Sequence, residues 1–165
     1  MSERPATRKE ILFLGGVATA LGSYFMLVGM TLLPIPGGPS NLHGPLWIVF
    51  CAGLAFLLAG IAVLMHGAGA TGNNGELAPG APQWLRVFQY LSGVTIFVCF
   101  GAIASWIAFA PGPREFTGSG LGVTGPVSGM AGRIAFGIGA IVIWLCTISV
   151  AVAGARKLMN RQTGV

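Results

Sequence analysis

The chain has 165 residues, of which 54% are hydrophobic and only 8% charged, and its mean hydropathy is +0.80. A soluble domain carries about a quarter charged residues, so this composition excludes a water-facing surface over most of the molecule. The formal net charge is +5. The basic residues gather in the two terminal tails and form no stripe with interleaved aromatics, so we expect no nucleic-acid partner.

Four apolar runs are each long enough to cross a bilayer core, which requires about 20 residues. None of them contains Asp, Glu, Lys or Arg. In hydrocarbon the backbone must satisfy its own hydrogen bonds, so these runs predict helices. The fold class is therefore an all-α integral membrane protein with four transmembrane helices in a compact bundle. The predicted spans are residues 11–33, 46–65, 87–110 and 134–155.

The segments between the spans determine the expected orientation. The tails (1–10 and 156–165) and the inner loop (66–86) together carry seven basic residues, whereas the outer loops (34–45 and 111–133) carry two. Because cytoplasmic segments are enriched in Lys and Arg, both termini are expected in the cytoplasm. The localisation expected is the cell's inner (plasma) membrane, with the lipid bilayer as the first partner.

Small residues recur at spacings of three, four and seven on each predicted helix, which keeps them on one face. Small residues allow helix backbones to approach closely in a membrane, so these faces predict helix packing within a bundle or between subunits. The predicted packing residues are Gly15, Ala18, Gly22 and Gly29, then Ala52, Ala55, Ala59 and Ala62, then Gly101, Ala104 and Ala108, and lastly Ala135, Gly139, Cys146, Ser149 and Ala153.

Residues that could carry chemistry are few. His43 lies in the first outer loop and His66 at the inner end of the second span, roughly 30 Å apart along the membrane normal at about 1.5 Å per residue, so they cannot share a metal within one chain. Trp144 lies at mid-span, where it packs, faces lipid or touches a cofactor. His66 and Trp144 are thus the only cofactor-binding candidates, and we expect neither a cofactor nor a metal.

Catalytic groups are also scarce. The chain contains four acidic residues, which are Glu3, Glu10, Glu76 and Glu115, and none lies within a span. General acid–base catalysis therefore has almost no groups to use, and we expect a protein that is not an enzyme. Three separated cysteines without a CxxC pattern indicate packing rather than metal binding.

The second outer loop begins with "FAPGPREF", in which prolines end the third helix. It is long and rich in glycine, which is typical of a linker or a binding segment. Arg114, Glu115 and Phe116 are its interaction candidates. The first helix ends in the comparable "LLPIPGGP", so two similar αα-hairpins in a 2+2 arrangement are one interpretation, and ordinary Pro–Gly helix stops are the other.

In length and number of spans the chain is similar to small four-helix inner-membrane proteins of bacteria and to small membrane subunits of some tripartite carboxylate transporters. The leading hypothesis from the residues is a non-catalytic accessory or structural subunit of a membrane complex or homo-oligomer, so the expected partners are other membrane subunits or further copies of the chain. A transporter or channel component is the alternative, and a haem- or quinone-binding electron-transfer subunit is the third.

Overall fold

A computed structural model gives the fold of most of the chain. The described residues are 7–35, 37–38, 44–71, 77, 80–112, 116–120 and 123–162.

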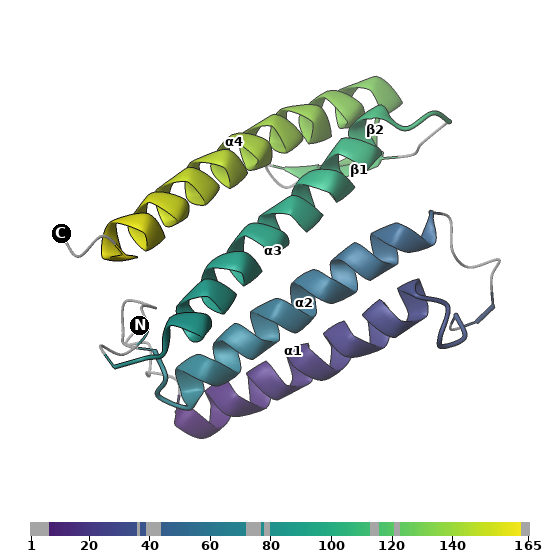
Figure 1. Cartoon of the computed structure of the whole chain (residues 1–165). Coiled ribbons are helices and arrows are strands. Elements are labelled where there is room, and N and C mark those ends of the chain that lie inside the picture. Colours follow the sequence, from purple (N-terminus) through teal and green to yellow (C-terminus); the bar gives the residue numbers. More distant parts are fainter. Residues whose placement is uncertain are drawn as a thin grey trace.

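Four long helices make up almost all of the structure (Figure 1). Within the described residues, all four are long and apolar enough to cross a membrane. They are α1 (Arg8–Gly29), α2 (Leu46–Gly67), α3 (Gln83–Phe109) and α4 (Gly129–Gln162). Helices α1, α3 and α4 begin before the predicted spans and α2 and α4 end after them, whereas α1 and α3 end before the predicted residue.

The start of α1 illustrates this difference. The Thr7 hydroxyl accepts a hydrogen bond from the Glu10 amide, and the Glu10 carboxylate accepts one from the Thr7 amide. This reciprocal capping box satisfies two amides that the helix would otherwise leave unpaired. Helix α1 therefore begins three residues before the predicted span, and it ends at Gly29, just before Thr31 takes a left-handed φ of 61°.

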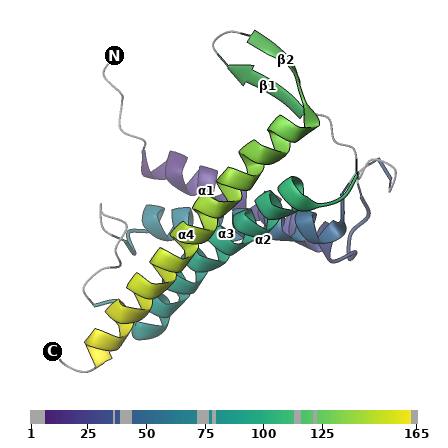
Figure 2. The same ribbon diagram turned by 90° about the horizontal axis from the view of Figure 1, so that it is seen from above.

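The helices pack in chain order. Packing is most extensive between α1 and α2, then between α3 and α4, and is weaker between α2 and α3. Helices α1 and α2 run antiparallel side by side, whereas α4 crosses over α3 at an angle (Figures 1 and 2). The first turn of α1 and the last turn of α4 lie at the same end of the molecule (Figure 1).

The second outer loop, predicted at residues 111–133 as a glycine-rich linker or binding segment, contains secondary structure that the sequence did not indicate. It contains an antiparallel hairpin of β1 (Phe116–Gly120) and β2 (Val123–Val127), with Phe116 opposite Val127. Phe and Thr in β1 and Val and Thr in β2 favour extended backbone, but abundant glycine hides the pattern. The hairpin projects away from the helices beside the start of α4 (Figure 2).

The closest packing lies between α1 and α2. A Cβ added to Gly22 would overlap the backbone of Leu57, and one added to Gly53 would overlap the backbone of Met26. A Cβ on Gly60 would lie 2.5 Å from the Thr19 amide nitrogen. The two helices therefore touch backbone to backbone, which only glycine permits at these positions.

Helix α2 also receives a cap from α1. The Arg8 guanidinium donates from Nε to the Gly67 carbonyl at 2.9 Å and from Nη2 to the Ala68 carbonyl at 3.5 Å. The last carbonyls of a helix lack partners within that helix and carry partial negative charge. Arg8 satisfies them and ties the start of α1 to the end of α2.

Candidate functional site

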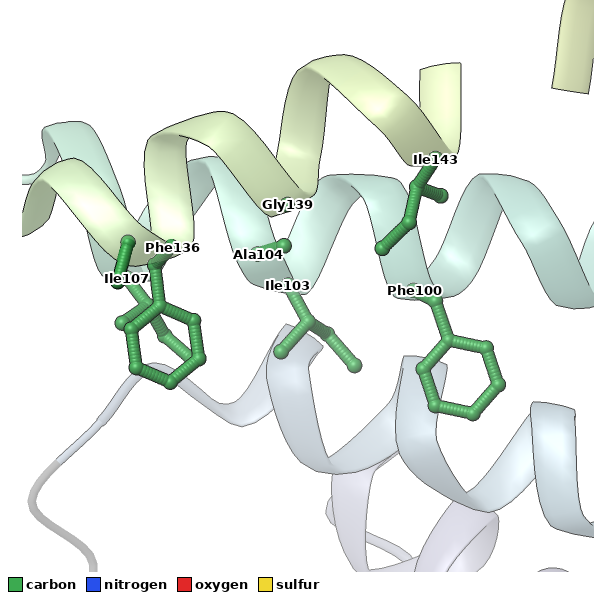
Figure 3. A pocket seen from close by; sticks show the side chains of 8 residues that line it. Phe100, Ile103, Ala104, Ile107, Phe136, Gly139 and Ile143 are labelled. Carbon is green, nitrogen blue, oxygen red and sulfur yellow. The ribbon is translucent and has the colours of Figure 1, made fainter. Parts of the chain in front are cut away.

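An apolar pocket between α3 and α4 is the clearest candidate site. Its volume is about 440 Å³, within the roughly 300–1,000 Å³ that is usual for ligand pockets. The side chains of Phe100, Ile103, Ile107 and Phe136 extend to the same side of the two helices, toward α2 (Figure 3). The pocket is lined by Phe100, Ile103, Ala104 and Ile107 from α3 and by Ala135, Phe136, Gly139 and Ile143 from α4.

The pocket lies toward the end of the helix pair that carries the β-hairpin. From Phe136 to Ile143 it follows two turns of α4, or about 10 Å at the usual helical rise. At its end nearest the hairpin, the Arg133 guanidinium donates a hydrogen bond to the Gly112 carbonyl just beyond α3. The Arg133 side chain therefore places a positive charge between the adjoining ends of α3 and α4, close to the apolar pocket.

On the side of the pocket away from the hairpin, aromatic rings of α3 and α4 lie against glycines of the opposite helix. The Trp144 ring lies over Gly101, where an added Cβ would come within 3.1 Å of its Cε2 atom. The Tyr90 ring occupies the position of a Cβ on Gly154, and its hydroxyl donates to the Ala151 carbonyl at 2.8 Å.

The two cofactor candidates have different partners at separate places. His66 is exposed at the end of α2, and its Nδ1 atom lies 3.0 Å from the Thr71 hydroxyl. Trp144 donates from its indole nitrogen to the Ser105 hydroxyl at 3.1 Å. Among the described residues no three His, Cys, Asp or Glu side chains gather where they could hold a metal.

The predicted packing face of α1 contacts α2. Gly15 and Gly22 are buried and Gly29 is half-buried, and added Cβ atoms on all three would crowd Leu64, Leu57 and Phe50. Ala18 on the same face is half-buried.

On α2 only part of the predicted packing face is buried within the chain. Ala55 is buried and Ala52 half-buried, but Ala59 and Ala62 are exposed. The residues that meet α1 are instead three glycines seven residues apart, the same spacing as on α1, and this shared spacing is the signal that could have identified them. They are Gly53, Gly60 and Gly67.

On α3 the predicted residues Gly101, Ala104 and Ala108 are all buried. On α4 the predicted small residues are exposed within the single chain, except for Gly139, which is half-buried. They are Ala135, Cys146, Ser149 and Ala153.

The face that α4 presents to the rest of the chain consists of other small residues. It is marked by the buried residues Gly132, Gly137, Ala140 and Thr147. Because small residues occur on both sides of this helix, spacing alone did not distinguish the side that packs within the chain from the opposite side.

Two cysteines that are far apart in sequence meet between α2 and α3. The Cys51 and Cys99 thiols are within hydrogen-bonding reach of each other, and both are free. Nearer the hairpin end, the rings of Trp47 and Trp106 pack edge to face with centroids 6.4 Å apart. Spacing along the chain gave no sign of the cysteine pair, which depends on the register of the two helices.

The remaining candidates are only partly described. Phe116 opens β1, and its side chain is outside the description. Arg114, Glu115 and His43 lie outside the described residues.

Comparison with known proteins finds no match for the chain among family models, curated proteins or solved structures.

Proposed function

We propose that the chain is a multi-pass inner-membrane protein that serves as a non-catalytic accessory or structural subunit of a membrane complex or homo-oligomer. Membrane insertion is supported by large apolar side chains that point outward on every helix. Among them, Phe13 is 72% exposed, Phe109 70% and Ile138 59%. In water this surface would be unfavourable by about 25 cal/mol for each Å², whereas hydrocarbon solvates it.

The orientation follows from charge. The basic residues at the chain's two ends favour a cytoplasmic location for both tails, because Lys and Arg are enriched on that side. The start of α1 and the end of α4 lie at one end of the molecule, as this topology requires. An internal duplication of the two helix pairs stays a prediction. The glycines that recur every seven residues on α1 and α2 have no counterpart in α3.

The observation that carries the subunit role is the second small-residue face of α4. Cys146, Ser149 and Ala153 are exposed, although they recur at spacings of three and four that are typical of helix-packing faces, whereas Ala135 and Gly139 line the α3–α4 pocket. Helix α4 packs mainly against α3, so this face is available to another helix. Cys146 is a free thiol within it.

Cys146 therefore permits a direct test in native membranes. We expect a membrane-permeable thiol crosslinker to join Cys146 to a second copy or to one defined partner subunit, giving a discrete higher-mass band. The Cys146→Ser variant should lose that band. A Cys51→Ser variant is the matched control and should keep it. A monomer that forms no adduct through Cys146, in membranes at native abundance, would contradict the subunit role.

Topology is tested separately with an engineered tail thiol. In a variant with all three cysteines changed to serine, Ser2→Cys should react with a membrane-impermeant maleimide only after the cells are opened. Labelling in intact cells whose outer membrane has been permeabilised would place this tail outside and overturn the orientation.

The transport and electron-transfer alternatives have their own readouts. Solute uptake by proteoliposomes that contain only this chain would favour a transporter or channel component. A haem absorption band or bound quinone that is lost on replacing His66 or Trp144 would favour electron transfer.

A further inference from the structure

The α3–α4 pocket requires an occupant in a membrane. Water does not settle in a cavity lined by apolar side chains, and an empty one forfeits the contacts of its walls. The pocket is open on one side toward its surroundings, and all eight lining residues are apolar. A flexible hydrocarbon chain is therefore the natural occupant of this space in a bilayer.

The end of the pocket adds a second chemical requirement. Arg133 precedes Ala135, the first lining residue of α4, by two residues, and it bridges α4 to the Gly112 carbonyl. Under the proposed topology this end lies at the outer membrane–water interface. An arginine at that depth complements a phosphate, because its planar guanidinium carries several donors toward oxyanions.

We propose that the pocket binds one acyl chain of an anionic phospholipid from the surrounding bilayer, with its headgroup phosphate held at Arg133. This site rests on the proposed membrane insertion. The hydrocarbon tail supplies most of the affinity, and the cation supplies a preference for a negatively charged headgroup over a zwitterionic one. The bound lipid completes the packing between α3, α4 and the neighbouring α2.

Gly139 provides a way to fill the pocket. It lines the cavity, and a Cβ built on it meets no other described atom within 4 Å. A leucine there occupies the space of the acyl chain. Gly93 on α3 is the matched control, because a Cβ there also meets nothing within 4 Å among the described residues, and it does not line the pocket.

The experiment is native mass spectrometry of the full chain in detergent, titrated with phosphatidylglycerol or phosphatidylcholine of matched chains. We expect one phosphatidylglycerol to bind most strongly. Gly139→Leu should weaken it by about tenfold or more, the equivalent of two displaced methylene groups. Gly93→Leu should leave it unchanged. Gly139→Val, which fills less of the pocket, replaces the leucine variant should that one not fold.

The headgroup is tested by Arg133→Gln, with Arg86→Gln at the opposite end of α3 as control. Losing one partly exposed ion pair should lower the preference for phosphatidylglycerol over phosphatidylcholine by about fivefold, with lipid still bound. Equal binding of phosphatidylglycerol by the Gly139→Leu and Gly93→Leu variants would overturn the acyl-chain site. An unchanged preference in Arg133→Gln, or equally strong binding of glycerol 3-phosphate without a tail, would overturn the headgroup assignment. Release of the chain from membranes by alkaline carbonate would instead refute membrane insertion itself.

Discussion

The two helix pairs are built from similar residues and pack by different means. Between α1 and α2, glycines on both helices remove the side-chain layer, so that Gly22 and Gly53 bring one backbone against the other. Between α3 and α4, glycines instead form hollows that receive the rings of Trp144 and Tyr90. The first pair is closed along its length, whereas the second pair contains a cavity of about 440 Å³.

This difference shows that a glycine on a membrane helix has two distinct uses. Opposite another glycine it sets the distance between helix axes, and opposite an aromatic residue it only provides a seat for a ring. The same Gly→Ala change should therefore have different consequences in the two pairs. The position of each glycine, and not its presence, determines the effect.

The largest effect is expected for Gly22→Ala. The new Cβ would lie 2.6 Å from Leu57 Cα and 2.8 Å from the Gly53 carbonyl oxygen, and backbone cannot move aside as a side chain can. We expect a loss of about 1–3 kcal/mol in the free energy of unfolding, measured by circular dichroism in mixed micelles of increasing denaturing-detergent content. Gly16→Ala is the control. Its Cβ meets no described atom within 4 Å, so the gain of about 0.5–1 kcal/mol from replacing a helical glycine should appear. A stabilising Gly22→Ala would contradict the backbone contact.

A smaller effect is expected for Gly101→Ala in the second pair. The new Cβ would lie 3.1 Å from the Trp144 ring, which can shift by a few tenths of an ångström. We expect the gain in helix propensity to offset most of the crowding, so the unfolding free energy should change by less than about 1 kcal/mol. Trp fluorescence should report the displaced ring. A loss as large as that of Gly22→Ala would remove the distinction between the pairs.

Tyr90→Phe tests the hydrogen bond that accompanies the ring in the second pair. The ring stays seated against Gly154, but the 2.8 Å hydrogen bond to the Ala151 carbonyl is lost. We expect a loss of about 0.5–1.5 kcal/mol in the same unfolding experiment. Tyr24→Phe on α1 is the control, since Tyr24 is exposed. Equal effects of the two changes would show that the Tyr90 hydroxyl contributes nothing specific.

A small and salt-dependent effect is expected for Arg8→Gln in the first pair. Glutamine removes the charge that faces the last carbonyls of α2, which is worth about 0.3–1 kcal/mol and is screened by salt. Lys9→Gln removes the same charge from an exposed neighbour. The difference between these variants should shrink as salt is raised, and a difference that persists at high salt would contradict the electrostatic origin.

The sequence predicts the four helices well, because hydropathy and the absence of charge reflect a requirement that acts along the whole span. It also locates Gly15, Gly22 and Gly29, which lie among larger side chains that mark one face of α1. On α2 nearly every residue is apolar, so alanines at positions 52, 55, 59 and 62 compete with the glycines and the phase of the packing face is ambiguous.

The pocket could not be predicted from the chain alone. Its position depends on the angle at which α4 crosses α3 and on which rings enter glycine hollows, and neither property has a local sequence signal. Gly139 was singled out for helix packing by its spacing, yet in the fold it lines the cavity. The role of Arg133 likewise depends on where α3 ends, because its partner carbonyl lies 21 residues earlier in the chain.

The glycine strip shared by α1 and α2 has a consequence for biogenesis. Without its partner, α1 would present bare peptide groups to lipid along three consecutive heptads, and the Arg8 side chain would lack the carbonyls that it neutralises. We expect these two helices to leave the translocon together, as one hairpin, so a nascent chain truncated before residue 46 should be recognised as incomplete and degraded.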